Sequence, residues 1–469
     1  MTDLHERFRA EFDAIPAPEL WDRIESLAVV ESTASEPVRV RRGIAIAIAA
    51  FAAVVVVIAA ATLALRGGGI EVFDDRVVPD TVEWSRVPHD DAVFGGEGGA
   101  EMLSIATNGS GFVAVGVTGD GVGDWRGDRN AAAWTSLDGV AWSRVPHDPD
   151  VFGDAGEQEM LDATVGGPGY VAVGYRFDEP GKSGVYPGVW VSPDGVTWST
   201  ASDDPESFGG MDGAMSSVTV GGPGLVAVGQ TRGGAAVWTS EDGITWTSVV
   251  DTEMVFDGGD MVAVTESGSV LVAVGRGGAY PSSSSNDGIT FTHEPGSSSA
   301  AVWTSPDGIN WARVSHDEAV FGGAAGQHCG MDAVTAGGSG LVALGHCEGY
   351  SVESAAEDGM VTHGDRVVIW TSADGHTWSQ VPRDEMVFVS DPSIDPDQSA
   401  YLDLYAINDG LIAFDLDGTW FSSDGYTWTR TSDHTMDGGV ADVVTTRAGL
   451  VAVGGDEGSA AVWVAERTQ

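Results

Sequence analysis

Basic residues are scarce in this chain. It contains 22 lysines and arginines against 70 aspartates and glutamates, and its only lysine is Lys182. The formal net charge of -48 repels nucleic-acid phosphates and anionic lipid headgroups. The composition therefore excludes a nucleic-acid partner and is typical of a protein kept soluble by its surface charge.

Cysteine is almost absent, with only Cys329 and Cys347. They flank a predicted hairpin with its turn near residues 337–340, so the two residues lie almost opposite each other. Outside the cell this placement predicts a disulfide. His328 and His346 precede the cysteines and suggest a zinc site as the alternative. Neighbours on a strand point to opposite faces, which favours the disulfide.

The sequence also lacks a recognisable catalytic set. Histidine precedes aspartate at His89-Asp90, His147-Asp148 and His316-Asp317, as in part of a catalytic triad. No serine or cysteine nucleophile motif accompanies these dipeptides, and repeated loop chemistry explains them better. We therefore predict no catalytic, cofactor-binding or metal-binding residue, and we lean against an enzyme without excluding one.

Tryptophan, in contrast, is plentiful and regularly placed. Twelve of the 16 tryptophans form six pairs whose members lie eight residues apart. The pairs are Trp134/Trp142, Trp190/Trp198, Trp238/Trp246, Trp303/Trp311, Trp370/Trp378 and Trp420/Trp428. Each pair encloses a Ser-x-Asp-Gly motif, whose aspartates are Asp138, Asp194, Asp242, Asp307, Asp374 and Asp424. These aspartates are predicted to be structural turn residues.

The motif predicts a tight β-hairpin. In the copy from Trp238 to Trp246, a three-residue turn places Ser240 opposite Ile244 and brings the two indoles face to face. Glycine at the last turn position supplies a positive φ, and the aspartate accepts hydrogen bonds from turn amides. We expect the opposed indoles to stabilise each hairpin.

The strand before each pair is a continuous apolar run, such as Leu225-Val226-Ala227-Val228. Runs without polar alternation are typical of strands covered on both faces. Successive pairs lie 48 to 67 residues apart, which fits four-stranded propeller blades with loop insertions. The fold class is therefore predicted to be all-β, a seven-bladed β-propeller over residues 81–469.

Two unpaired tryptophans indicate how the ring closes. Trp84 begins a copy of the outer strand without its partner, and Trp463 lies in the preceding strand type without a following turn. We therefore predict that the strand 82–87 completes the blade formed by residues 439–466, with Trp84 and Trp463 as the seventh pair. Closure of this kind leaves no free sheet edge.

A second pattern follows each outer strand. An aspartate lies six residues after the tryptophan, predicted to cap the connecting loop: Asp90, Asp148, Asp204, Asp317 and Asp384. A phenylalanine lies ten residues after it, predicted to fill the space between blades: Phe94, Phe152, Phe208, Phe256, Phe321 and Phe388.

The N-terminal region reads as a membrane anchor. Residues 43–65 carry no charge and are long enough to span a bilayer. Arginines precede this segment, so the positive-inside rule places residues 1–42, with two short predicted helices, in the cytoplasm. Residues 66–80 form a linker, and the propeller is then extracytoplasmic. A cleaved signal peptide is the alternative, although a 42-residue leader is too long for one.

The Ser-x-Asp-Gly-x-x-Trp hairpins resemble the Asp-box, or BNR, repeat of sialidase-like propellers, shortened by one residue. The resemblance covers residues 84–463 and implies the fold, because the box is structural in that family. Sialidases of the family use three arginines, a tyrosine–glutamate pair and an acid aspartate. The early Phe-Arg-Ile-Pro motif is missing here, so no family site residue carries over.

The N-terminal sequence Leu-Trp-Asp-Arg-Ile-Glu (residues 20–25), followed by arginines and one apolar segment, resembles actinobacterial membrane proteins, including some anti-sigma factors. Their zinc-binding His/Cys motif is missing. The resemblance implies a transmembrane signalling role as one alternative function.

These observations predict a membrane-anchored binding or scaffold module for a glycan, a peptide or an envelope protein. Recognition is expected in the long loops 117–132, 175–187, 276–300 and 346–368. A sialidase-like glycoside hydrolase is the alternative. Calcium is a further alternative in two acidic loops, containing Asp120, Asp124 and Asp128, and Asp391, Asp395 and Asp397.

Overall fold

The computed structural model divides the chain into two compact units, 1–75 and 76–469. It describes residues 83–95, 98–119, 129–153, 158–177, 184–201, 208, 212–251, 254–256, 258–278, 299–322, 328–337, 340–347, 350–354, 359–363, 366–382, 403–407, 410–415, 418–432, 438–446 and 449–466. The predicted tail, membrane segment and linker lie outside these ranges. Across the described residues, no helix is both long and apolar enough for a membrane span.

The described residues of the second unit form seven four-stranded antiparallel sheets, which are the blades. In each of the first three, the four strands lie side by side in chain order. Blade 1 contains β2 (Ala100–Thr107), β3 (Phe112–Thr118), β4 (Asn130–Ser136) and β5 (Trp142–Arg144). Blade 2 contains β6 (Gln158–Gly166), β7 (Gly169–Phe177), β8 (Val185–Ser192) and β9 (Ser199–Thr200). Blade 3 contains β10 (Gly213–Gly221), β11 (Gly224–Thr231), β12 (Gly234–Ser240) and β13 (Thr247–Ser248).

The next three blades repeat this order, with one insertion. Blade 4 contains β14 (Asp260–Ser267), β15 (Val270–Gly277), β16 (Ser299–Ser305) and β17 (Ala312–Arg313). Blade 5 contains β18 (Cys329–Gly337), β19 (Gly340–Cys347), β22 (Arg366–Ser372) and β23 (Ser379–Gln380), with the hairpin β20 (Tyr350–Ser354) and β21 (Gly359–His363) inserted. Blade 6 contains β24 (Asp403–Ile407), β25 (Gly410–Asp415), β26 (Gly418–Ser422) and β27 (Thr429–Ser432).

The seventh blade joins the two ends of the described chain. Three of its strands come last in sequence: β28 (Gly439–Thr445), β29 (Gly449–Asp456) and β30 (Ser459–Glu466). Its outer strand is β1 (Trp84–Arg86), in which Arg86 pairs with Trp463 and Trp84 with Ala465. The N-terminal strand therefore closes the ring. Arg86 also forms an ion pair with Asp456 across this junction.

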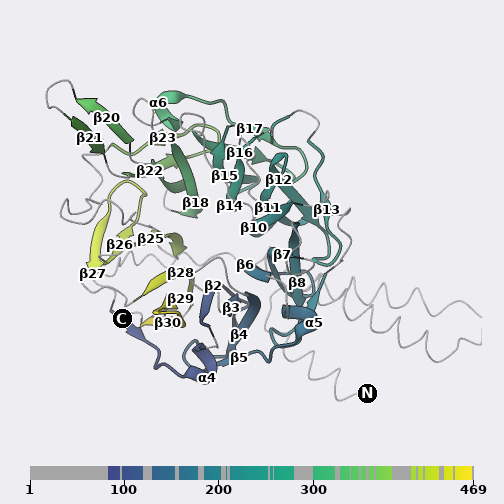
Figure 1. Ribbon diagram of the computed structural model, residues 1–469. Coiled ribbons are helices and arrows are strands. Elements are labelled where there is room, and N and C mark those ends of the chain that lie inside the picture. Colours follow the sequence, from purple (N-terminus) through teal and green to yellow (C-terminus); the bar gives the residue numbers. More distant parts are fainter. Residues whose placement is uncertain are drawn as a thin grey trace, which may run out of the picture. The chain divides into compact units, whose positions relative to one another are not determined.

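The blades are arranged as a ring around their first strands (Figure 1). The first strand of each sheet contacts the first strand of the next, from β2 through β6, β10, β14, β18, β24 and β28 back to β2. Buried clusters combine residues of neighbouring blades, as when Val113 of β3 packs with Met160 and Trp190 of blade 2. The prediction of an all-β seven-bladed propeller is confirmed.

The register of the Ser-x-Asp-Gly hairpin differs from the prediction. Trp134 pairs with Arg144, and Ser136 pairs with Trp142, so the turn holds five residues instead of three. In blade 3, Trp238 correspondingly lies opposite Ser248. The expectation of directly opposed indoles was therefore wrong.

The aspartate of the box accounts for the longer turn, as blade 1 illustrates. One oxygen of Asp138 accepts the backbone N–H groups of Val140 at 2.9 Å and Ala141 at 2.7 Å. The hydroxyl of Ser136 accepts the N–H of Gly139 at 2.9 Å, and Gly139 has a φ of +80°. The N–H of Ala141, followed by that of Val140, lowers the pKa of Asp138. The turn is thus stabilised by an ionised carboxylate.

In blades 1 to 5, a tryptophan of the third strand fixes the connector that enters its blade. The Trp134 indole N–H donates to the carbonyl of Val93 at 2.7 Å. Val93 lies in the short helix α4 (Asp91–Phe94), capped by Asp90; α5 (Pro149–Phe152) and α6 (Glu318–Phe321) are the equivalent helices, capped by Asp148 and Asp317. The connector phenylalanines within the described residues are buried: Phe94, Phe152, Phe208, Phe256 and Phe321. Asp90, Asp148 and Asp317 and these phenylalanines have the expected roles, whereas Asp204, Asp384 and Phe388 lie outside the described residues.

We predict that Asp242→Ala lowers the free energy of unfolding by about 1–3 kcal/mol, because the amides of Ile244 and Thr245 lose their acceptor. Asp242→Asn keeps one acceptor oxygen and should cost less. Chemical denaturation of the full chain, followed by tryptophan fluorescence, checks the difference. Equal effects of both substitutions would contradict the assigned role of the carboxylate.

Deleting residues 83–88 should remove the outer strand of blade 7 and expose the edge of β30. We expect the melting temperature to fall by roughly 5 °C or more and the protein to associate in solution. Scanning calorimetry and light scattering measure both effects, with Glu83→Ala as the control. A deletion variant that melts like the parent and stays monomeric would rule out the closing role of β1.

Candidate functional site

In blades 1 to 5, two positions carry residues that change from blade to blade. One is the residue before the buried methionine of the first strand, and the other follows the glycine near the end of the second strand. They pair across the hairpin, for example Glu159 with Tyr175 and Asp260 with Arg276. We call the polar residues at these positions the loop-side rim, because the second strand ends there in the loop to the third: Glu101, Glu159, Tyr175, Gln230, Asp260, Arg276 and His346.

The rim of blades 1 and 2 carries a compact polar cluster. The Tyr175 hydroxyl donates to Glu159 Oε2 at 2.5 Å, and Arg129 Nη1 donates to the same oxygen at 2.7 Å. The Arg129 and Glu159 side chains are 16% and 10% exposed, so water screens this ion pair only weakly. Arg129 precedes β4 of blade 1, and the cluster therefore joins two blades.

Glu101 lies close to this cluster. Its carboxyl lies over Gly455 of blade 7, where an added Cβ would come within 3.4 Å of Glu101 Oε1. Burial and the neighbouring Glu159 carboxylate raise the pKa of Glu101, while Arg129 opposes the rise. Within the described residues, no hydrogen-bond donor is assigned to the Glu101 side chain. It is therefore the rim carboxyl best placed to accept a donor from a ligand.

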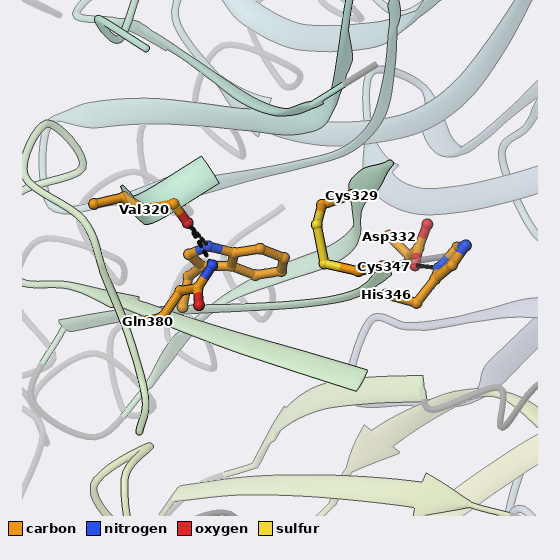
Figure 2. The surroundings of a disulfide bond; sticks show 7 residues. Val320, Cys329, Asp332, His346, Cys347 and Gln380 are labelled. Atoms are coloured by element: carbon orange, nitrogen blue, oxygen red, sulfur yellow. Dashed lines mark hydrogen bonds and ion pairs between the residues drawn. A yellow bond between two sulfur atoms is a disulfide. The ribbon is translucent and has the colours of Figure 1, made fainter. Parts of the chain in front are cut away.

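A second cluster lies between blades 4 and 5. His346 Nδ1 lies 2.6 Å from Asp332 Oδ2, and Arg276 Nη2 lies 3.3 Å from Asp332 Oδ1. Figure 2 shows the His346 and Asp332 side chains pointing toward each other. Arg276 crosses from β15 onto Gly330 of β18, where an added Cβ would meet Arg276 Nε at 2.5 Å. All three side chains remain partly exposed, so this arrangement presents a cation and an imidazole at the rim.

The structure links Cys329 and Cys347 in a disulfide next to this cluster (Figure 2). The two residues pair directly across β18 and β19, and both are buried. The two cysteine sulfurs are bonded to each other, and His346 is paired with Asp332. The disulfide holds the start of β18 against the end of β19.

Closer to the middle of the first strands, three polar side chains meet. The Ser104 hydroxyl lies 3.0 Å from Asp162 Oδ1 and 2.9 Å from Asp442 Oδ2. The residues come from β2, β6 and β28, so they connect blades 7, 1 and 2. Each carboxylate also accepts backbone amides: Asp162 from Val218 at 2.8 Å, and Asp442 from Ile105 at 2.8 Å. These contacts tie neighbouring blades together.

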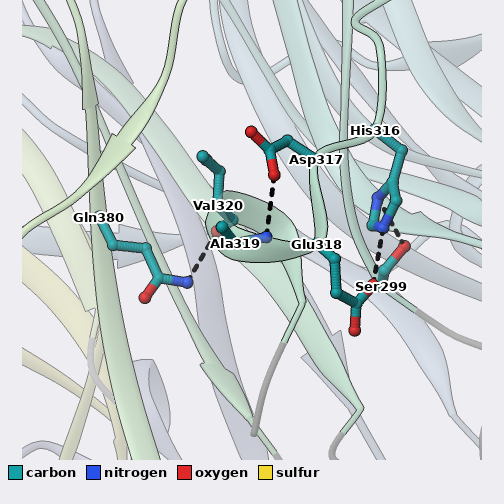
Figure 3. A network of polar contacts seen from close by, with 7 residues as sticks. All are labelled: Ser299, His316, Asp317, Glu318, Ala319, Val320 and Gln380. Atoms are coloured by element: carbon teal, nitrogen blue, oxygen red, sulfur yellow. Dashed lines mark hydrogen bonds and ion pairs between the residues drawn. The ribbon is translucent and has the colours of Figure 1, made fainter. Parts of the chain in front are cut away.

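The His-Asp dipeptides remain in the connectors. His316 Nε2 lies 2.9 Å from Glu318, and Ser299 Oγ lies 3.4 Å from His316 Nδ1, which gives the serine–histidine–glutamate row in Figure 3. His89 makes the equivalent contact with Asp91 at 2.8 Å. The histidines at 89 and 316 are exposed, and each packs against the connector phenylalanine of its own loop. The repeated geometry indicates loop structure.

The acidic loops considered for calcium, around Asp120–Asp128 and Asp391–Asp397, lie outside the described residues. In the part of the chain that the structure describes, no group of three or more His, Cys, Asp or Glu residues is arranged to hold a metal ion. The long loops expected to carry recognition are described only at their ends, apart from β20 and β21.

Sequence reasoning missed the Ser104–Asp162–Asp442 contacts and the Glu159–Tyr175–Arg129 cluster. Asp162 and Asp442 occupy one register position, two residues after Met160 and Val440 and beyond a β-bulge. Asp403 has the same register on β24. Aligning the first strands would have shown this recurrence, and aligning the hairpins would have placed Glu159 opposite Tyr175. The Arg129 contact crosses between blades and leaves no such signal.

Comparison with known proteins gives a likeness to solved structures only; no family model and no curated protein sequence match. Virginiamycin B lyase from Staphylococcus aureus has 8% identity and a TM-score of 0.44, over 82% of this chain and 99% of the lyase. Saccharomyces cerevisiae Sqt1 has 11% identity and a TM-score of 0.42, over 80% and 98%. Trypanosoma rangeli sialidase in complex with sialic acid has 13% identity and a TM-score of 0.41, over 82% and 58%.

We predict that mass spectrometry of the unreduced, alkylated full chain will find Cys329 and Cys347 linked. Reduction should lower the melting temperature, because the bridge holds the β18–β19 pair together at its open end. A Cys329→Ala/Cys347→Ala variant provides the matched control and should not respond to reductant. Two alkylated thiols in the untreated protein would exclude the bridge.

Proposed function

We propose that this protein is a membrane-anchored, extracytoplasmic binding or scaffold module whose ligand contacts the loop-side rim. The ligand class is a glycan, a peptide or an envelope protein. The propeller supplies a rigid frame, and side chains at one end of the first two strands supply recognition. Residues 43–65 supply the anchor.

One observation carries the proposal, the contrast between the frame and the rim. The residues that build the frame recur in nearly every blade: the Asp-box turn, the third-strand tryptophan and the connector phenylalanine. The rim changes from blade to blade, with Tyr175, Gln230, Arg276 and His346 at equivalent places. Residues with no common structural task are free to be selected for contacts with a ligand.

The direction in which the chain enters the propeller supports the same face. Trp84 is equivalent to Trp142, the first strand residue after the Asp-box turn. β1 therefore begins at the end of blade 7 where the Asp-box turns lie. The rim is at the opposite end of the strands.

Glycan cleavage is the second candidate, and one specific feature favours it. Tyr175 and Glu159 form a hydrogen-bonded tyrosine–glutamate pair, the combination that the Asp-box resemblance associates with sialidases. However, Arg129 already neutralises Glu159, and Arg276 is paired with Asp332. A carboxylate substrate would need arginines that are not committed to acidic partners. The binding function therefore agrees better with the rim.

The detergent-purified full chain should bind members of a printed glycan array or of a peptide library, and should not hydrolyse sialosides or aryl glycosides. Glu101→Gln removes one charge at the rim without changing shape. We expect it to lower the affinity for the best array ligand about tenfold, equivalent to about 1.4 kcal/mol of binding free energy. The melting temperature should stay nearly unchanged. Titration calorimetry measures the affinity.

Glu241→Gln is the matched control, because Glu241 is exposed in an Asp-box turn at the other end of the strands. It should bind like the parent chain. If Glu241→Gln lowers the ligand affinity and Glu101→Gln does not, the ligand binds at the Asp-box turns and not at the rim. Glycoside turnover that Tyr175→Phe abolishes would establish the hydrolase instead.

A further inference from the structure

The contacts of Ser104 limit how many protons the polar side chains around it can share. Its Oγ lies within hydrogen-bond distance of two carboxylate oxygens, Asp162 Oδ1 at 3.0 Å and Asp442 Oδ2 at 2.9 Å. The backbone N–H of Ala163 also donates to Ser104 Oγ, at 3.2 Å. Three polar groups therefore surround one hydroxyl.

A serine hydroxyl has one proton to donate and two lone pairs to accept with. If both carboxylates are ionised, the hydroxyl proton satisfies only one of them. The other carboxylate oxygen then faces the serine oxygen at about 3 Å with no proton between them. Because two acceptors at this distance repel each other, the arrangement lacks one proton.

One added proton completes the set of hydrogen bonds. A protonated carboxyl donates to Ser104 Oγ, the Ala163 N–H donates to its second lone pair, and the Ser104 hydroxyl donates onward to the remaining carboxylate. Asp162 accepts from the Val218 N–H and the Ser217 hydroxyl and, in addition, shares the Ala163 N–H with Ser104 Oγ. Asp442 has two donors, the backbone N–H groups of Ile105 and Val443. The additional donor favours the ionised form of Asp162.

We infer that Asp442 is protonated in the folded protein and donates to Ser104, which donates to Asp162, so that one exchangeable proton links blades 7, 1 and 2. The proton lies in the blade that contains both the closing strand β1 and the last strands of the chain.

The surroundings of Asp442 agree with this assignment. Among the described residues, no arginine or lysine forms an ion pair with either aspartate. Asp403 occupies the same register on neighbouring β24, and Tyr405 of β24 donates its hydroxyl to the Ala441 carbonyl. On β29, Asp456 is paired with Arg86, and on β2 the ionisable residue is Glu101, nearer the rim. Groups that would stabilise a charged Asp442 by ion pairing are absent from these described strands.

Burial raises the pKa of Asp442 to about 7; the Ile105 N–H opposes this rise, and the Asp162 carboxylate adds to it. Burial also raises the pKa of Asp162. Both side chains keep some accessible surface, yet the first strands of the ring surround them. A pKa raised on folding means that the folded state binds the proton more tightly than the unfolded state. The resulting stabilisation is complete below pH 4 and is lost as the pH rises through about 7.

Infrared difference spectroscopy of the full chain tests the inference directly. At pH 6, where ordinary aspartates are ionised, the parent chain should show the C=O stretch of a protonated carboxyl, shifted by deuterium exchange. Asp442→Asn should abolish this band, while Asp138→Asn should retain it, because turn amides keep Asp138 ionised. Ser104→Ala retains both central aspartates and should shift the band, since the carboxyl loses its acceptor.

Thermal unfolding of the same proteins between pH 5.5 and 8.5 provides the second readout. The melting temperature of the parent should fall as the pH rises through about 7. In Asp442→Asn the fall should be smaller, and in Asp138→Asn it should match the parent. A parent spectrum without the carboxyl band at pH 6 would overturn the inference whether or not the variants fold. A band lost in Glu101→Gln instead of Asp442→Asn would place the proton at the rim and also refute it.

Discussion

The hydrogen bond from a third-strand tryptophan to the incoming connector is the contact on which the ring depends. Trp134, Trp190, Trp238, Trp303 and Trp370 each donate their indole N–H to a connector carbonyl at 2.7–2.9 Å. Without this bond a buried N–H and a buried carbonyl would both lack a partner. The same indole ring fills the space between neighbouring blades. One side chain thus fixes both the spacing of the blades and the path of the chain between them.

The Ser-x-Asp-Gly turn completes this frame at the other end of the strands. Its glycine packs tightly, since an added Cβ on Gly139 would lie 2.9 Å from Val451 of the neighbouring blade. The tryptophan that follows the turn donates its indole N–H to a turn carbonyl, as Trp142 does to that of Gly139. In β1, the buried indole nitrogen of Trp84 has no partner among the described residues.

Repetition in the frame leaves the rim free to vary. Because the fold needs only the turn, the tryptophan and the apolar strands, charged residues at the rim are held by local pairs that differ between blades. Glu159 is held by Arg129 and Tyr175, and Asp332 by Arg276 and His346. The shared hydroxyl of Ser104 adds polar contacts between blades nearer the centre. The frame and the rim thus occupy different parts of the same blades.

The sequence by itself determined the number of blades, the closing strand and the roles of the box aspartates and connector phenylalanines. These features rest on local patterns repeated in each unit, such as the spacing of Trp238 and Trp246. The structure, and not the sequence pattern, decided the length of the turn: one Asp138 oxygen accepts two amides within the turn and stabilises a longer loop than the glycine alone requires. It also decided the contacts of Arg129 with Glu159 and of Ser104 with Asp442. Those partners are 30 and 338 residues apart, and closure of the ring is what brings the second pair together.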